Sequence, residues 1–378
     1  MRICVITSAK FPPEEGIGNY IYNMSKEFIK KGHNVVIITR GKFKKTYLEI
    51  YDGIKIYKVS FILLYPFHLY IHGIFLNKLL KSIEDDFDVI HIHSPLPPLV
   101  NSRIPILLTI HSPMKSGASV LKTTDFFSIA TKFQAKYISY PLEMKLIKNS
   151  TMVTAVSTTV LKDLEAYGLK HINVKLVYNG VNQNVFFPSN VISKDKYVLY
   201  TGRISYGKGL VEFINCAKEV CEFRNDINFV LAGDGPLLSN LKRKVKKMDL
   251  QNKIKFLGKV DRKRIICLYQ NATIFAFPSY YEGLPGSLLE AMACQLPIVA
   301  TEVPGNIELI EHKKNGILIP PKDSSALFRA VMDLLDDSIK RENLGKNARV
   351  TIENKFTWDT VSDRILSYYN SMLQGRSF

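Results

Sequence analysis

Short runs of β-branched residues alternate with amphipathic segments along the chain, and each run is followed by a loop and a helical pattern. This order is typical of parallel α/β architecture. In the first half, the predicted strands are Ile3–Thr7, Val35–Thr39, Val89–Ile92, Ile106–Ile110 and Val153–Val156. In the second half, they are Tyr197–Thr201, Asn228–Ala232, Ile254–Leu257, Ile274–Ala276, Ile298–Ala300 and Ile317–Ile319.

The polar run Asn182–Asn190 separates the two series of strands and has turn chemistry without either periodicity, so we predict it as an interdomain linker. The length of 378 residues also favours two domains. We expect a Rossmann-like domain over 1–185, with a C-terminal helix at about 357–378 packing back on it. A second Rossmann-like domain is expected over 186–356. Each would be an open doubly wound parallel sheet, and two facing sheets would bind a ligand in the cleft between them.

One uncharged stretch, Val59–Asn77, lies between Lys58 and Lys78. It contains Pro66, Gly73 and two histidines, so we predict a buried strand end followed by a helix rather than a membrane-spanning helix.

The composition is that of a globular protein, with 46% hydrophobic and 22% charged residues, and it excludes disordered, collagen-like and disulfide-scaffold classes. The net charge of +17 favours polyanionic partners, namely nucleic acid, anionic lipid or a phosphorylated small molecule. Five scattered cysteines indicate a reducing compartment, and the short apolar N-terminus resembles a first strand rather than a signal peptide. We therefore expect a cytoplasmic protein.

The segment Ser279–Ala293 carries the most chemical information. It follows a predicted strand and opens a helix near Pro285, so the free N–H groups of Gly286 to Leu288 would form an anion site. Glu282 precedes this helix and Glu290 lies within it. Carboxylates beside an anion site suit sugar hydroxyls. The alternative is that Glu282 is a solvated loop charge and that Glu290 pairs with a lysine.

The loop Thr201–Gly209 follows the first strand of the second half. Its glycines allow close approach of backbone to a ligand, and Arg203 and Lys208 place two cations in one loop. The alternative is a solvent-facing basic loop. A Walker phosphate loop is excluded because the GK[ST] ending is absent.

Histidines offer two further candidates. His91 and His93 alternate on one strand and with Asp88 suggest a metal site, but the sequence supplies no third ligand of that kind nearby, and we predict no metal. His111 follows the strand Ile106–Ile110, at the end where ligands bind.

Taken together, these segments resemble the group-1 (family 4) retaining glycosyltransferases of the GT-B fold. The resemblance rests on the Glu282–Glu290 spacing in EGLPGSLLEAMA, and on FPPEEGIG, GHNVVIIT, FDVIHIHS, LTIHS, YNGVNQNVF, TGRISYGKG and LAGDGP in this order. Gln295 stands where this motif usually has a glycine, so it would have to fit a tight helix-to-strand turn.

The resemblance implies a retaining hexosyltransferase that uses a UDP- or GDP-linked sugar and a glycan or glycolipid acceptor, with no cofactor. It implies catalytic roles for His111 and Glu282, both against the donor sugar. The donor-binding residues that it implies are Gly16, Arg203, Lys208, Gly283, Leu284, Gly286, Ser287 and Glu290.

Several alternatives, among them a non-catalytic relative with the same fold, and one further partner stay open. A phosphorylase or a nucleotide-sugar epimerase is possible on the same fold, and Asp86-Phe87-Asp88 matches the D-x-D pattern of GT-A glycosyltransferases, although we interpret it as a helix-to-strand turn. A basic nucleic-acid-binding protein is less favoured, because no binding module is recognisable. Lysines within 126–150, together with Lys42, Lys44 and Lys45, predict contact with an anionic membrane surface.

Overall fold

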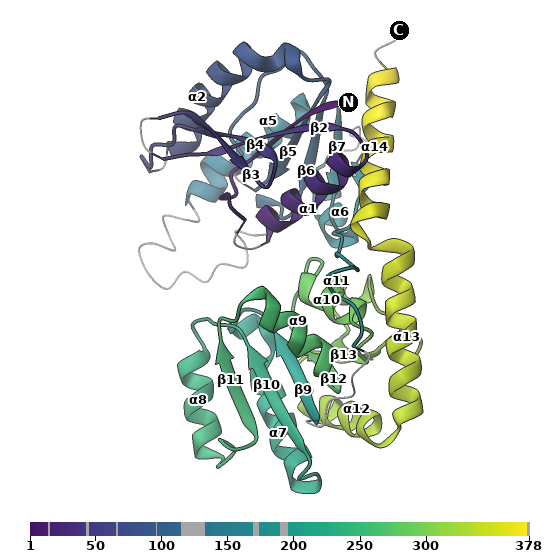
Figure 1. The fold of residues 1–378 in the computed structure, drawn as a ribbon. Helices are drawn as coiled ribbons and strands as arrows, with labels where there is room; N and C mark the ends of the chain where they lie inside the picture. The colour runs from purple at the N-terminus through teal and green to yellow at the C-terminus, as the bar shows by residue number, and fades with distance from the viewer. Residues whose placement is uncertain are drawn as a thin grey trace. The chain divides into compact units, whose positions relative to one another are not determined.

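The computed structural model describes residues 1–13, 16–42, 45–65, 67–95, 97–114, 133–168, 174–189 and 196–375. It divides into two compact units, Met1–Asn179 with Val361–Phe378, and Gly180–Thr360 (Figure 1). The last helix, α14 (Trp358–Gln374), therefore lies mostly in the first unit. The ranges 1–185 and 186–356 stay a prediction for the separately folding domains.

The first unit is built on a sheet with the strand order β3-β4-β2-β1-β5-β6-β7-β8. Its strands are β1 (Arg2–Thr7), β2 (Asn34–Arg40), β3 (Tyr47–Tyr51), β4 (Ile54–Val59), β5 (Val89–Ser94), β6 (Ile106–Ile110), β7 (Met152–Ala155) and β8 (Val174–Leu176). Its helices, besides α14, are α1 (Ile17–Lys30), α2 (His68–Ile83), η1 (Glu84–Asp86), η2 (Ala135–Ser139), α5 (Tyr140–Asn149) and α6 (Thr158–Glu165).

This sheet is parallel except at its edge strand β3, so the expected doubly wound α/β architecture is confirmed for the first unit. The edge strand β3 pairs antiparallel with β4 through a turn at Asp52 and Gly53, whose φ angles are 48° and 80°. Two consecutive residues with positive φ are typical of the tight turns that join antiparallel strands. The uncharged stretch after Lys58 does begin with a buried strand end, Val59, and continues into α2.

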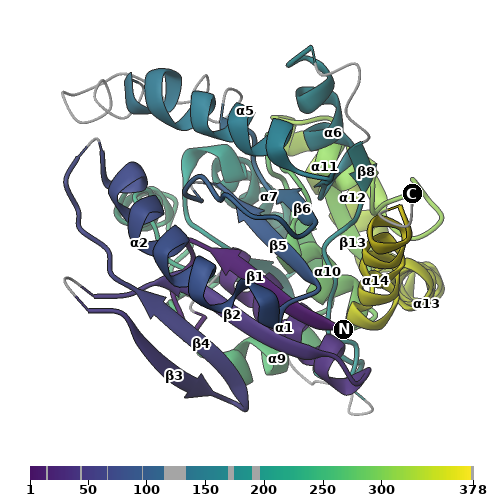
Figure 2. The same cartoon turned by 90° about the horizontal axis from the view of Figure 1, so that it is seen from above.

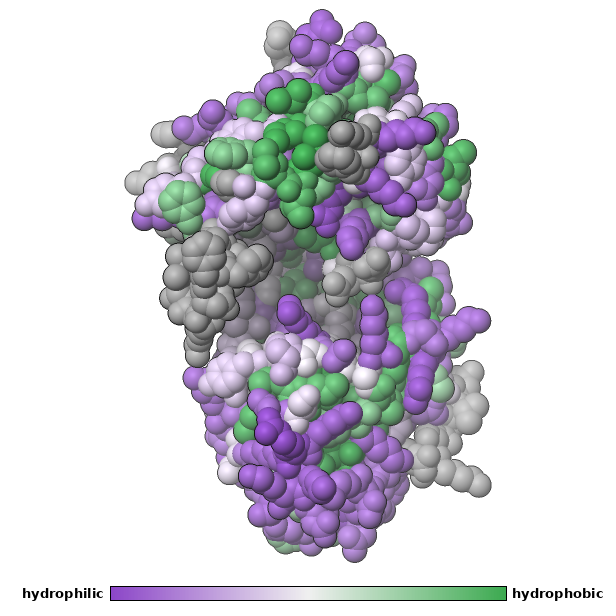
Figure 3. Space-filling view, turned by 90° about the vertical axis from the view of Figure 1, so that its left-hand side faces the viewer, coloured by the Kyte–Doolittle hydropathy of each residue, from purple (hydrophilic) through white to green (hydrophobic). Residues whose placement is uncertain are grey.

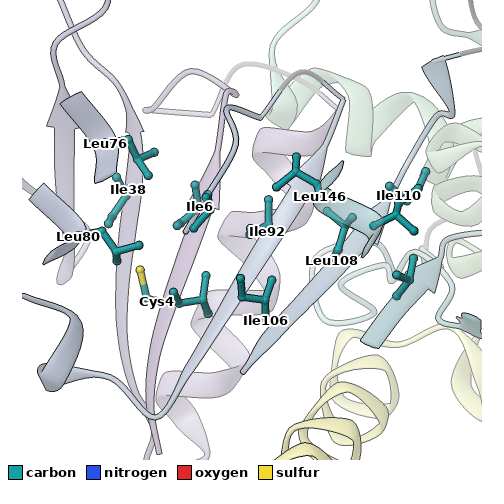
Figure 4. Packing of buried hydrophobic residues seen from close by; sticks show 14 of the residues in the cluster. Cys4, Ile6, Ile38, Leu76, Leu80, Ile92, Ile106, Leu108, Ile110 and Leu146 are labelled. Atoms are coloured by element: carbon teal, nitrogen blue, oxygen red, sulfur yellow. The ribbon is translucent and has the colours of Figure 1, made fainter. Parts of the chain in front are cut away.

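The alternation of β-strand side chains gives the first sheet two different faces. Ile90 and Ile92 on β5 point to the face covered by α2, where they pack with Leu76 and Leu80 in a hydrophobic cluster (Figures 2 and 4). His91 and His93 point to the opposite face, where His91 contacts Tyr369 of α14. The face under α2 carries this hydrophobic cluster, and the two histidines are buried on the opposite face.

The second unit contains a parallel sheet with the order β11-β10-β9-β12-β13-β14. The strands are β9 (Lys196–Thr201), β10 (Ile227–Ala232), β11 (Ile254–Gly258), β12 (Ile274–Phe277), β13 (Ile298–Thr301) and β14 (Ile317–Ile319). The helices are η3 (Tyr206–Lys208), α7 (Leu210–Phe223), α8 (Leu238–Lys247), α9 (Arg262–Asn271), α10 (Gly286–Ala293), α11 (Pro304–Ile307), α12 (Ser324–Asp336) and α13 (Ser338–Lys355).

The run expected to be a linker is instead packed into the second unit over its first residues. Phe186 is 1% exposed, and Arg349 of α13 donates hydrogen bonds to the carbonyls of Gln183 and Phe186. Within the run, the Asn182 side chain accepts a hydrogen bond of 3.0 Å from the Asn184 N–H. The sequence pattern alone did not indicate that Phe186 is buried in the second unit.

Candidate functional site

The strand order of the second unit reverses between β9 and β12, which is the point where open α/β sheets bind ligands. The loop after β9 and the loop after β12 touch at this point. The Tyr280 N–H donates to the Gly207 carbonyl at 2.8 Å, and a Cβ placed on Gly209 would lie only 1.8 Å from the Pro278 oxygen. The fold therefore brings the two candidate loops together at the reversal of the strand order.

Lys208 and Glu282, one from each loop, form an ion pair with 2.6 Å between Nζ and Oε1. The Glu282 side chain is 8% exposed and that of Lys208 is 25% exposed, so the carboxylate is shielded from solvent and the lysine side chain is partly accessible to it. The alternative that Glu282 is a solvated loop charge is wrong. Arg203, in the same loop as Lys208, is exposed.

Helix α10 starts directly after this pair, with Pro285 as its N-cap residue. The prediction for its free N–H groups is wrong at Leu288, whose N–H donates to the Pro285 carbonyl at 3.2 Å. The N–H groups of Gly286 and Ser287 make no hydrogen bond within the described residues. Added Cβ atoms on Gly283 and Gly286 would meet nothing within 4 Å, so the start of the helix has open space beside it. Leu284, in contrast, is buried and supports the turn.

Glu290 lies one turn further along α10 and contacts a tyrosine rather than a lysine. Its Oε2 accepts a hydrogen bond of 3.1 Å from the hydroxyl of Tyr269 on α9, which also lies 2.5 Å from Thr201 Oγ1. Burial raises the pKa of Glu290 to about 7. Tyr269 was not predicted from the sequence, because it lies 21 residues from Glu290 along the chain and reaches it only in the folded structure.

The turn after α10 accommodates Gln295 with a positive φ of 62°. Asparagine and glycine are the common residues in this conformation at a helix end. The Gln295 carbonyl lies 2.2 Å from the position that a Cβ would take on Gly345 of α13. The tight turn expected from the sequence therefore exists, with a glycine on the facing helix giving it room.

His111 directly follows β6 in the first unit and is half-buried. Its Nε2 lies 3.1 Å from Nδ1 of His93, and the ring of Tyr20 from α1 meets it edge-on with 4.8 Å between centroids. Burial lowers the pKa of His111 to about 3, so the ring is neutral. Gly16, the N-cap residue of α1, has a φ of 53° and open space around its Cα.

Behind His111 the strand histidines continue a buried polar chain. His91 bonds to Thr109 Oγ1 through Nε2, at 2.7 Å, and to the Tyr369 hydroxyl through Nδ1, at 2.6 Å. Asp88, the third residue of the suggested metal site, is ion-paired with Arg2 instead. Over the part of the chain that is described, no three His, Cys, Asp or Glu side chains form a group that could hold a metal ion.

A second buried carboxylate, Glu143 on α5, supports the loop that follows His111. It accepts hydrogen bonds from Ser94 Oγ, the Met114 N–H and the Tyr167 hydroxyl, and burial raises its pKa. Glu143 is the one acidic residue of its helix, but its sequence neighbours do not indicate that it is buried.

Among the described helices, none has both the length and the apolar character needed to span a membrane.

Two family models match this chain over most of its length. "Glycosyl transferases group 1" matches residues 181–351, and "Glycosyltransferase Family 4" matches residues 15–185. Together with the two Rossmann-like sheets and the loops that meet at the strand reversal, these matches define the class of protein. The chain belongs to the group 1 glycosyltransferases and has the GT-B fold.

Among particular relatives, the chain is 26% identical to an uncharacterized glycosyltransferase of Methanocaldococcus jannaschii, with 99% of each chain covered. It is 25% identical to 2-deoxystreptamine N-acetyl-D-glucosaminyltransferase of Niallia circulans, over 94% of this chain and 97% of the relative.

Two solved structures show the same fold. Sucrose-phosphate synthase from Thermosynechococcus elongatus superposes with a TM-score of 0.79 at 20% identity, covering 99% of each chain. HepE from Anabaena, solved in complex with UDP and glucose, has a TM-score of 0.73 at 18% identity and covers 98% of this chain and 99% of its own.

Proposed function

We propose that this glycosyltransferase moves a hexosyl group, with retention of anomeric configuration, from a UDP- or GDP-linked sugar to a hydroxyl of a glycan or lipid-linked acceptor. The observation that carries this proposal is the Lys208–Glu282 ion pair beside the open N-terminus of α10. A nucleotide-sugar donor is also supported by the similar HepE fold, which was solved with UDP and with UDP-glucose.

The diphosphate of the donor fits the positive side of the crevice. Lys208 keeps its ammonium partly exposed, Arg203 is exposed in the same loop, and the N–H groups of Gly286 and Ser287 lie at the positive end of the α10 dipole. These groups stabilise the charge that builds on the departing diphosphate. They supply this stabilisation without a metal ion, so the proposed reaction is metal-independent.

We propose that the two carboxylates bind sugar hydroxyls and that Glu290 accepts hydrogen bonds from the nucleotide ribose. The Tyr269 hydroxyl, which donates to one oxygen of Glu290, supports this by fixing the orientation of the carboxyl group. We propose that Glu282 and His111 bind the transferred sugar, and that Gly283, Leu284 and Gly16 form backbone turns against the donor. A neutral His111 suits this role, because a neutral ring donates a hydrogen bond without adding charge near a developing oxocarbenium ion.

We propose a front-face mechanism for retention. The bond between the anomeric carbon and the diphosphate oxygen breaks, the acceptor oxygen bonds to the same face of that carbon, and the acceptor proton passes to the departing phosphate oxygen. A double displacement would instead need a carboxylate nucleophile beneath the anomeric carbon. Glu282 is held by Lys208 at 2.6 Å, which lowers its nucleophilicity.

A thermal-shift panel of UDP-, GDP- and ADP-linked sugars tests the donor class. Selective binding raises the melting temperature by mass action, and the responding ligand identifies base and sugar together. A panel in which no nucleotide-sugar shifts the melting temperature more than inorganic phosphate contradicts the proposal.

Turnover of variants tests the assigned roles once the donor is known. Lys208→Ala should lower kcat/KM by about a hundredfold or more, because a cation at the leaving group is lost. Lys218→Ala, on the exposed side of α7, removes the same charge away from the crevice and should leave turnover unchanged. Intact-mass spectrometry with donor should show no glycosyl-enzyme, and finding one would contradict the front-face mechanism.

A further inference from the structure

Six large hydrophobic side chains are exposed on the segment that runs from the end of β4 into α2. This apolar patch consists of Leu63, Leu64, Tyr65, Phe67, Tyr70 and Ile74. Leu63 is 76% exposed and Ile74 is 68% exposed. So many exposed large hydrophobics within twelve residues exceed what scattered surface residues explain, and such patches mark contact with an apolar partner.

A neighbouring element extends the apolar patch. Leu69 of α2 packs against Ile138 of η2 and Leu142 of α5, so these helices lie together in the first unit. Phe133 and Tyr137, at the start of the same helical segment, are each 56% exposed and contact one another with 4.7 Å between ring centroids. Figure 3 shows hydrophobic side chains gathered into one area on this unit, with hydrophilic side chains at its margin.

The charges on the segment that carries the apolar patch are of one sign, and acidic residues begin only at Glu84, after the end of α2. The chain contains no aspartate or glutamate from Gly53 to Ile83 but has four lysines there, of which Lys78 and Lys81 are exposed on α2. On the neighbouring helices Lys136, Lys145 and Lys148 are exposed. Glu143, their one acidic residue between 133 and 149, is buried and bonded inward. The partner of this surface is therefore both apolar and anionic.

A groove of about 440 Å³ follows α2 and is lined by both apolar side chains of the patch and lysine side chains. Its lining includes Tyr70 and Ile74 at one end of the helix and Lys78 and Lys81 further along. A lipid has this same order of groups, with an apolar chain attached to a charged head group. A second copy of this chain would instead bring its own lysines against these lysines.

We propose that the apolar patch inserts into the head-group boundary of an anionic bilayer, with Lys78, Lys81 and Lys136 contacting the lipid phosphates. Interfacial membrane proteins bind by this combination of buried apolar side chains and basic residues at the rim. The proposal rests on the lipid-linked acceptor of the proposed function, since a membrane-embedded acceptor requires the enzyme at the bilayer. It moves the membrane contact predicted from the lysine-rich segment to a surface whose centre is apolar.

Sedimentation with vesicles tests this surface. The full chain should bind vesicles of phosphatidylglycerol and phosphatidylcholine, and bind vesicles of phosphatidylcholine alone far more weakly. The triple variant L63S/L64S/F67S should lower the partition coefficient at least about tenfold, because three apolar side chains no longer insert. K78Q/K81Q should lower it on the order of twentyfold for the anionic vesicles.

The matched control is I339S/V350S, which removes two exposed hydrophobic side chains from α13 of the second unit and should bind vesicles as the natural chain does. Equal binding by L63S/L64S/F67S and the natural chain overturns the proposal. So does a natural chain that is dimeric by light scattering and becomes monomeric in that variant, since the patch would then join two copies. Neither measurement uses a nucleotide-sugar, so failure here is separable from failure of the donor panel.

Discussion

Glu290 is a carboxyl group whose protonation is tied to its place on α10. Burial raises its pKa to about 7, well above that of a free glutamate, so the folded protein holds a proton there that the unfolded chain releases. Between about pH 5 and pH 7 the folded state binds more protons, and the free energy of unfolding therefore falls as pH rises. In the role proposed for Glu290, binding of ribose hydroxyls has the opposite pH trend, because accepting hydrogen bonds favours the ionised form.

We expect Glu290→Gln to remove this pH dependence. The amide keeps an oxygen for the Tyr269 hydroxyl but carries no titrating proton. Relative to the natural protein, the variant should gain about 2 kcal/mol in unfolding free energy between pH 5 and pH 8. Urea unfolding at both pH values measures the difference. An equal difference at pH 5 and pH 8 would show that Glu290 titrates normally.

The candidate residues that the sequence revealed are those whose role is indicated by their immediate neighbours in the sequence. Lys208 and Glu282 stand in loops with recognisable glycines and a proline before a helix, so their types and spacing already suggest an anion site. Tyr269 and His93 act through partners brought by other elements, 21 and 18 residues away. Such pairings depend on the register of strands and helices, which residue spacing does not contain.

The loop between β9 and α7 depends on glycine in a way that separates neighbouring positions. Gly209 has a φ of 63°, and a Cβ there would collide with the Pro278 carbonyl at 1.8 Å. Gly207, two residues earlier, has nothing within 4 Å of such an atom. Gly209 is needed for the two loops to meet, whereas Gly207 has open space beside it.

Gly209→Ala should therefore lower the unfolding free energy by about 3 kcal/mol and abolish the thermal shift given by the nucleotide-sugar. Gly207→Ala, with the same added methyl group, should change stability by less than about 0.5 kcal/mol. Thermal denaturation with and without donor measures both effects. Equal stability of the two variants would contradict the close loop contact.

At the level of elements, most strands that the sequence predicted are buried on both faces, with β11 as an exception. Ile106–Ile110 and Ile298–Thr301 are fully buried, and their continuous apolar runs are unmistakable. The hairpin of β3 and β4 was missed, because its side chains alternate between exposed and covered positions and include lysine and glutamate. Its Asp52-Gly53 turn was the available signal.

At the scale of the whole chain, the helix α14 returns to the first unit after the second unit is complete. Tyr369 of α14 is completely buried in the first unit, where its hydroxyl bonds to His91 Nδ1 at 2.6 Å across 278 residues of sequence. Lys31 and Asp363 add an ion pair between the end of α1 and the same helix. Since exposed ion pairs contribute little, the buried hydrogen bond is the stronger of these two attachments.

Tyr369→Phe should lower the unfolding free energy by about 2 kcal/mol, because one nitrogen of the buried His91 is left without a partner. Tyr368→Phe, on the half-buried neighbouring position, loses a hydroxyl with no such partner among the described residues and should cost less than about 0.5 kcal/mol. Hydrogen exchange of the β5 amides reports the loss where it occurs. Unchanged exchange in Tyr369→Phe would show that the hydroxyl does not hold the helix.

The division of the chain into units has a consequence for how the protein is made. The first unit is discontinuous, since residues 361–378 complete a structure begun by residues 1–179, while residues 180–360 form an unbroken unit. During synthesis the second unit leaves the ribosome entire, although it is encoded later. The first unit keeps an uncovered face on β5 until α14 emerges, so a chain released before residues 361–378 are made contains a complete second unit and an incomplete first unit.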